Sequence, residues 1–156
     1  MSVSHHCKVV SSTGKVIPWS NEIRYLGIYI IGSREFKCSL DIAKKSFYPA
    51  ANAILGKVGR HASEEVIFQL VSSTCMPVLL YGLEACPLNK AAVNSLDFGI
   101  NRFFMKLFKS NNIDIVRKCQ ELFAFSLPSV LLAHRSGHFL VKYKDCDNAF
   151  CKLLLF

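Results

Sequence analysis

The sequence predicts an α+β fold that is mainly helical, in which a short N-terminal β-hairpin or strand segment precedes a bundle of about five or six helices. Hydrophobic residues make up 51% of the 156 positions and include twelve Phe, which is enough apolar material for one core. Positions 6–31 are rich in β-branched and aromatic residues, whereas apolar residues recur at helical spacing from Ser39 onward. We therefore expect a β segment over residues 1–38, a helical domain over 39–143 and a tail over 144–156.

Three strands are predicted in the β segment, of which the first two are short. His6–Val10 and Lys15–Ile17 lie on either side of a turn-forming run, Ser11–Gly14. Ile23–Ile31 is expected to be a longer strand, because it lacks proline and carries apolar residues on both faces. Such a strand requires cover on both sides, which three strands do not readily supply for themselves. The pattern thus indicates that a covering partner is missing.

Helical periodicity and capping residues place the helices that follow. Pro49 lies inside the first of them, which starts near Ser39, and an interior proline predicts a kink or two shorter helices. The remaining starts are marked by N-cap residues or by prolines in a first turn: Ser63 for the second, Pro77 for a short third helix through Tyr81, Asn89 for a fourth with an apolar stripe to Leu107, Asn112 for the fifth, and Ser126 with Pro128 for the sixth.

Charge and cysteine usage narrow the class of protein. Nineteen Lys and Arg against eleven Asp and Glu give a net charge of +8, which favours an anionic partner, nucleic acid being the commonest. A basic protein with a solvated lysine surface is the alternative. Seven cysteines without an apolar leader predict reduced thiols in an intracellular protein, cytoplasmic or nuclear and not secreted. No stretch is long and apolar enough for a membrane span, so we expect no membrane partner.

Two segments carry a resemblance to a known family. The first is Tyr25-Leu26-Gly27, and the second is Pro77–Glu84, which reads Pro-Val-Leu-Leu-Tyr-Gly-Leu-Glu. The likeness continues through residues 101–108 and 124–130 and covers roughly Ile23 to Lys144. These segments resemble the C-terminal connection and thumb region of non-LTR (LINE-type) retrotransposon reverse transcriptases, which are RNA-directed DNA polymerases.

The resemblance implies a binding role without the polymerase chemistry. In that family two metal ions, held by palm carboxylates that include an aspartate pair, activate the primer hydroxyl and stabilise the leaving pyrophosphate. No Asp-Asp pair occurs in this sequence. We therefore expect no catalytic residue and no cofactor in this chain alone, magnesium belonging to the parent polymerase, and we expect it not to be an enzyme by itself.

Basic residues on two predicted helices are the candidates for nucleic-acid binding. Arg102, Lys106 and Lys109 fall at i, i+4 and i+7 on the side of the fourth helix away from its apolar stripe. Lys44 and Lys45 form a second basic patch on the first helix. A thumb lays a helix along a primer–template duplex, where such cations neutralise phosphates without reading sequence. The alternative is a solvated basic face of an amphipathic helix.

Two further features have a structural and a functional interpretation. Tyr25, Leu26 and Gly27 resemble a primer grip, where a glycine lets backbone approach a ligand, but they also fit a plain buried strand. Glu84 stands in an apolar stretch and would be costly to bury alone, so we expect it to pair with a base such as Arg102.

Histidine and cysteine residues suggest two weak metal-site candidates. His134 and His138 share a helix face upstream of Cys146 and Cys151, but their spacing matches no zinc-finger pattern. The run 5–7, His-His-Cys, lacks a fourth ligand nearby. We therefore expect no metal site.

Three functions remain open. The first is a thumb-like fragment that binds nucleic-acid backbone and, in the parent protein, packs on the palm. The second is a non-functional relic of a truncated element. The third is a small helical protein-interaction module that uses an exposed strand edge.

Overall fold

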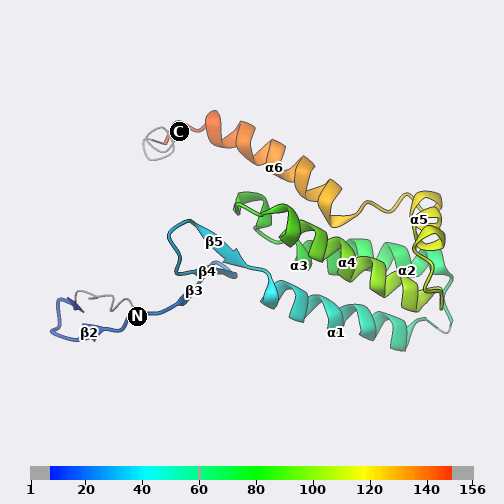
Figure 1. Ribbon diagram of the computed structural model, residues 1–156, viewed down its shortest axis with the longest axis horizontal. Helices are drawn as coiled ribbons and strands as arrows, with labels where there is room; N and C mark the ends of the chain where they lie inside the picture. Colours follow the sequence, from blue (N-terminus) through cyan, green and yellow to red (C-terminus); the bar gives the residue numbers. More distant parts are fainter. Residues whose placement is uncertain (1–7, 60, 149–156) are drawn as a thin grey trace.

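The computed structural model describes residues 8–59 and 61–148, which form an N-terminal strand region followed by five helical segments (Figure 1). The predicted fold class, α+β and mainly α, is confirmed. The strands form a two-stranded sheet and a three-stranded sheet, both antiparallel: β1 (Val9–Val10) with β2 (Val16–Ile17), and β3 (Glu22–Tyr25), β4 (Ile28–Ile31) and β5 (Lys37–Ser39) in that order.

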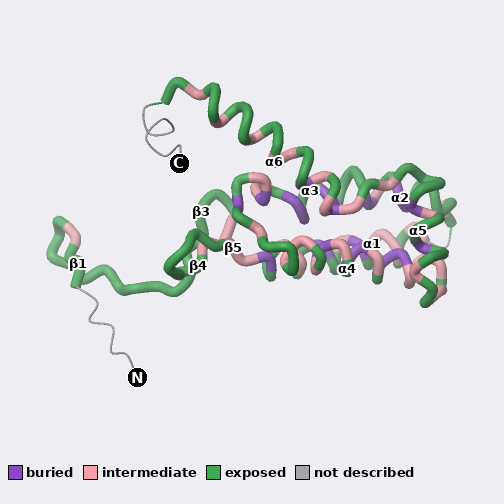
Figure 2. The backbone as a smooth tube through the Cα atoms, turned by 45° about the horizontal axis from the view of Figure 1, so that its top comes forward, coloured by how far each residue is buried: buried purple, intermediate pink, exposed green. Residues whose placement is uncertain are grey.

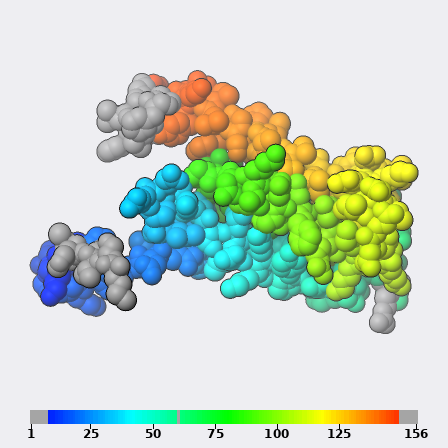
Figure 3. Space-filling model, in the orientation of Figure 1, coloured from blue at the N-terminus to red at the C-terminus, as the bar shows by residue number. Residues whose placement is uncertain are grey.

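The β1–β2 hairpin projects from the rest of the molecule (Figures 1 and 3). The predicted turn is present: the Ser11 amide donates to the Lys15 carbonyl, and Gly14 takes a positive φ of 77°. The first strand is shorter than expected, since it begins at Val9, and the start of the predicted range lies outside the described residues.

The predicted single strand Ile23–Ile31 is wrong, because the chain turns back in its middle. Leu26 and Gly27 have positive φ angles of 46° and 87° and form the two-residue loop between β3 and β4. Tyr25 pairs with Ile28 across this loop. Two consecutive residues with positive φ are the geometry of a tight hairpin turn whose twist matches that of the strands. The glycine in the apolar run was the signal for this turn.

The three-stranded sheet meets the helices through two glycines. A Cβ on Gly27 would approach the Tyr81 ring to 3.3 Å, and a Cβ on Gly82 would collide with the Ile28 side chain. The segments that carry the family resemblance, Tyr25–Gly27 and Pro77–Glu84, are therefore in contact. Strand β4 is half-buried against the helices, whereas all four residues of β3 are exposed.

Helix α1 (Asp41–Lys57) is continuous through Pro49, so the expected division into two helices is wrong. A proline leaves the carbonyl four residues earlier, that of Lys45, without its helical donor. Both Pro49 and Lys45 are exposed, so this face of the helix is open to water, which can hydrogen-bond a backbone carbonyl. The helix survives because the proline lies on its solvent side.

The second and third predicted helices form one helical run. Helix α2 (Glu64–Leu70) passes through a π-helical turn (Val71–Cys75) into α3 (Met76–Leu79). Pro77 lies two residues after this turn, in the first turn of α3. Wider π-type hydrogen bonding accommodates a residue that lacks an amide hydrogen, which explains why no break occurs.

The C-terminal helices begin where their caps predict. The Asn89 side chain accepts from the Ala92 amide at 2.8 Å at the start of α4 (Lys90–Leu107). Asn112 accepts from Asp114 at the same distance before α5 (Ile113–Leu122). A 3₁₀ turn, Leu83–Ala85, precedes α4, and α6 (Pro128–Lys144) begins at its proline. Across residues 8–59 and 61–148, none of the helices combines the length and hydrophobicity needed to cross a membrane.

The core lies between α1, the α2–α3 run and α4, whose inner faces are buried (Figure 2). Phe68 stacks on Phe104 and on Phe123, with ring centroids 4.3 and 4.6 Å apart, and Phe125 packs edge-on against Phe104. The core is continuous with the strand region, because Leu40, directly after β5, is buried in it. The domain boundary expected at residue 38 thus falls inside β5.

Candidate nucleic-acid interface

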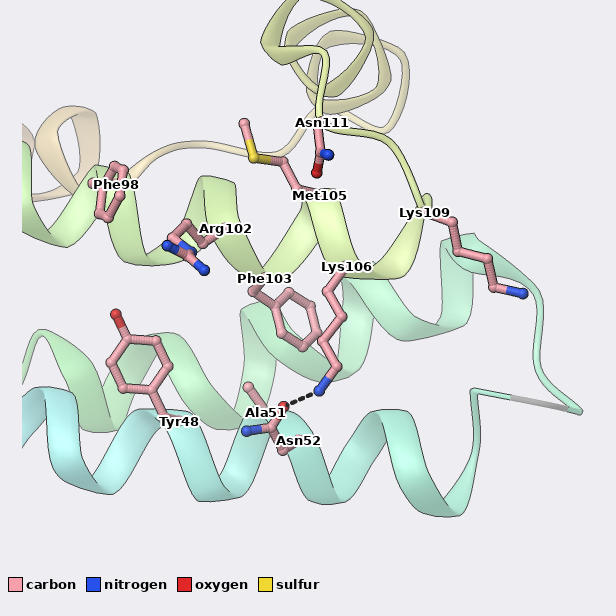
Figure 4. A pocket seen from close by; sticks show the side chains of 10 residues that line it. All are labelled: Tyr48, Ala51, Asn52, Phe98, Arg102, Phe103, Met105, Lys106, Lys109 and Asn111. Carbon is pink, nitrogen blue, oxygen red and sulfur yellow. Dashed lines mark hydrogen bonds between the residues drawn. The ribbon is translucent and has the colours of Figure 1, made fainter.

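A groove of about 860 Å³ lies between α1 and α4 (Figure 4). Helix α1 contributes Tyr48 and Asn52, and α4 contributes Phe98, Arg102 and Lys106. We call this feature the α1–α4 groove and define it by these five residues together with Lys109, Phe103 and Met105, which also line it.

Polar contacts across the helix pair hold the groove in shape. The Lys106 ammonium donates to Asn52 Oδ1 at 2.9 Å. Beyond the other end of the groove, the Lys44 ammonium donates to Ser95 Oγ at 2.7 Å. Lys44 is hydrogen-bonded to Ser95, and Asn52, further along α1, is hydrogen-bonded to Lys106, further along α4. Helices α1 and α4 therefore run in the same direction.

Gly99 allows the two helices to approach each other at the level of Tyr48. A Cβ at position 99 would lie 2.9 Å from the Tyr48 hydroxyl oxygen, so a larger residue would push the ring away from α4. Below it, the buried Phe103 forms the floor and packs edge-on against Phe47, with centroids 6.4 Å apart. The floor of the groove is thus part of the core, and its walls are fixed.

The groove is cationic. Among the described residues that line it are Arg102, Lys106 and Lys109 and no acidic side chain. Within residues 8–59 and 61–148 no carboxylate lies within salt-bridge distance of these three cations. The Arg102 guanidinium carbon lies 5.8 Å from the Phe98 ring centroid, which is a cation–π contact. The site therefore presents unneutralised positive charge beside aromatic surface.

The structure places Arg102 and Lys106 on an exposed face of α4, on the side away from the buried Leu96 and Ile100 of the apolar stripe. This face lies beside α1. Another side of α4 is covered by α5 and α6, where Asp97 accepts from the Ser129 amide and Asn101 accepts from Gln120. Lys109 is not on the helix at all. It follows the end of α4 at Leu107 with a positive φ of 51°, and its ammonium points away from the other two (Figure 4).

The second predicted basic patch is divided. Lys44 is half-buried and points to Ser95 on α4, in line with the groove, whereas Lys45 is exposed and does not line it. Adjacent residues on a helix point about 100° apart, so only one of two neighbours can face a given partner.

The primer-grip-like residues lie at the tip of the β3–β4 hairpin and not in the groove. Tyr25 and Leu26 are exposed by 63% and 72%. Gly27 instead lines a second, 580 Å³ groove between the sheet and the helices, with Tyr81 and Pro77. The alternative for these residues, a plain buried strand, is wrong, because Tyr25 and Leu26 are exposed.

The expected pairing of Glu84 with Arg102 is wrong. Glu84 lies in the 3₁₀ turn next to α6, where the Ser136 hydroxyl donates to its carbonyl at 3.4 Å, whereas Arg102 faces α1. Within the described residues, Glu84 Oε2 is buried without a hydrogen-bond partner.

The Cys86 thiol lies two residues beyond Glu84 and keeps its proton to high pH. The pKa of this thiol is raised to about 12, and burial is the largest cause. A hydrogen bond to Cys38, the charge of Cys38 and the charge of Glu84 contribute to this rise in the same direction.

The histidine candidates do form a pair, with His134 and His138 rings 4.5 Å apart. Within the part of the chain that the structure describes, no cluster of three or more His, Cys, Asp or Glu could hold a metal. Cys151 and the run 5–7 lie outside the described residues.

Sequence reasoning missed the aromatic and amide residues of the groove. Phe98, Asn52 and Tyr48 had no assigned role in binding. A signal was present, because Lys44, Tyr48 and Asn52 recur at four-residue spacing and share one helix face. The sequence alone does not show that this face of the first helix packs beside residues 98–106.

Comparison with protein-family models, with curated protein sequences and with solved structures finds no match to this chain. The interpretation of the groove therefore depends on its geometry and charge.

Proposed function

We propose that this chain binds the backbone of nucleic acid through the α1–α4 groove, as a thumb-like C-terminal fragment of a non-LTR reverse transcriptase. The observation that carries the proposal is the set of three cations in one groove with no carboxylate partner among the described residues. Unpaired cations beside a helix pair are suited to phosphates, whose bound counterions they displace. The partner proposed is an RNA–DNA or DNA duplex inside the cell, in the cytoplasm or nucleus.

The positions of the two motif segments support the family origin. Tyr25–Gly27 and Pro77–Glu84 are far apart in the sequence and in contact in space, and two glycines make the contact possible. A chance likeness of two separate segments does not require them to pack on each other. The proposal assigns no polymerisation to this chain, because the aspartate pair of that chemistry does not occur in its 156 residues.

A binding titration with a fluorescent RNA–DNA duplex tests the proposal. The double variant Arg102→Gln/Lys106→Gln removes two groove cations and should lower the affinity roughly tenfold at low salt. The matched control, Lys118→Gln/Lys142→Gln, removes the same charge from exposed positions on α5 and α6. If both double variants lose affinity equally, net charge and not the groove accounts for binding.

A second candidate is a protein-binding role for strand β3. This strand is at the edge of its sheet, and Ile23 and Tyr25 are exposed by 62% and 63%. An exposed edge with apolar side chains can pair with a strand of another protein, such as a palm domain. Recovery of a defined protein partner after nuclease treatment, lost on Ile23→Lys substitution, would favour this role over the first.

A further inference from the structure

Two exposed aromatic rings lie at one end of the α1–α4 groove. Phe98 is exposed by 61% and Tyr48 by 41%, although both belong to helices whose other aromatic residues are mostly buried. Figure 4 shows the Arg102 guanidinium between these two rings, with Tyr48 rising from α1 toward α4. Phosphate binding alone gives no reason for exposed rings beside the cations, since cations on a polar surface suffice for it.

Contacts within the structure hold both rings in place. Tyr48 packs edge-on against the buried Phe47, with centroids 5.5 Å apart, and its hydroxyl abuts Gly99. The Arg102 guanidinium lies over the Phe98 ring, 5.8 Å from its centroid. Rings that are fixed before a ligand arrives lose little conformational entropy on binding, which favours their use as contact surfaces.

We propose that the α1–α4 groove takes an unpaired nucleotide, with its base stacked on the face of the Phe98 ring that Arg102 leaves uncovered, Tyr48 beside it, and its flanking phosphates on Arg102 and Lys106. Exposed rings interleaved with cations are the combination that binds single-stranded nucleic acid, because every base has a flat face and every linkage a negative charge. In a duplex both faces of each base are already stacked. The groove should therefore bind a single strand, or the unpaired end of a duplex, more tightly than a blunt duplex, which it holds through the phosphates alone.

This inference rests on the proposed function, because both use the same groove, but the two make different predictions. Backbone binding depends on the cations and on salt. Base stacking depends on the rings, and it disappears when the base is removed and the phosphates stay.

The test compares fluorescent oligonucleotides of about 12 nucleotides. Single-stranded RNA and single-stranded DNA are each used intact and with abasic residues, together with a blunt duplex. Binding to the wild-type chain is expected to be about tenfold tighter for intact than for abasic strands, and tighter for single strands than for the duplex. Phe98→Leu should lower affinity for intact strands about tenfold and leave abasic strands within about twofold. The slope of affinity against salt should not change, because no phosphate contact is lost.

Matched variants separate stacking from a loss of structure. Phe98→Tyr keeps a ring and should bind as the wild type does, and Phe36→Leu removes a ring that is 52% exposed but lies outside the groove. Equal affinity of the wild type for intact and abasic strands would overturn the stacking inference and leave backbone binding standing. Absence of salt-dependent binding to every probe would overturn both.

Discussion

Single residues decide how the sheet is joined to the helices. Gly82 has a φ of +69°, and its missing Cβ leaves the space that the Ile28 side chain occupies. Gly27 has the same role opposite Tyr81. The two motifs of the family resemblance thus depend on glycine for a physical reason that the sequence pattern alone does not give.

Replacing Gly82 by alanine should destabilise the protein by about 1–3 kcal/mol, because it adds a strained positive φ and a collision with Ile28. Gly56→Ala is the matched control: Gly56 is in α1 with a negative φ, and nothing lies within 4 Å of its Cβ position. That change should stabilise the protein by up to about 1 kcal/mol. Urea unfolding measures both, and equal effects of the two substitutions would contradict the packing described here.

Ionisation of the Cys86 thiol should make the free energy of unfolding depend on pH in the alkaline range. The pKa of this thiol is raised from 9.0 to about 12 in the folded protein, first by burial, so the folded state keeps a proton that the unfolded state loses. The stability from the buried neutral thiol is complete below pH 9 and is lost as pH rises toward 12. The free energy of unfolding should therefore fall over this range, and less steeply for Cys86→Ala. A variant whose pH profile matches that of the wild type would show that Cys86 does not contribute.

At the scale of elements, helical periodicity and asparagine caps predicted α1, α4, α5 and α6 from the sequence. The predictions failed at two places where the local backbone differs from the pattern of the sequence. Leu26-Gly27 turned one predicted strand into a hairpin, and Pro77 did not separate two helices, because a π-helical turn absorbed it. Only the α4 side of the groove was predicted from the sequence. Spacing along α4 revealed its cations, but the partner face on α1 follows from packing between segments some fifty residues apart, such as Asn52 and Lys106.

Pro49 in the interior of α1 offers a direct test of this element. Pro49→Ala restores an amide donor to the Lys45 carbonyl on an exposed face, and it should raise stability by roughly 1–3 kcal/mol. A thermal melt measures the change. A lower melting temperature would mean that the proline ring makes a stabilising contact that the exposed position of residue 49 does not suggest.

For the whole molecule, one connected core reaches from Leu40 to Leu132 and includes residues of every helical segment. A chain with such a core should be a soluble monomer that unfolds in one cooperative transition. The alternative of a non-functional relic predicts aggregation instead, driven by exposed apolar residues of the sheet such as Ile23 and Leu26. Light scattering and calorimetry distinguish these outcomes, and aggregation at all concentrations would favour the relic.

The central claim is that the α1–α4 groove binds nucleic-acid phosphates, and the salt dependence of affinity tests it most directly. The slope of log affinity against log salt counts the phosphates that the protein neutralises, at about 0.7–0.9 per contact. For a labelled RNA–DNA duplex, the Arg102→Gln/Lys106→Gln slope should be shallower than that of the wild type by about 1.5, which corresponds to two lost contacts. The Lys118→Gln/Lys142→Gln slope should equal that of the wild type. Equal slopes for the groove variant and the wild type would contradict the assignment of this groove as the binding site.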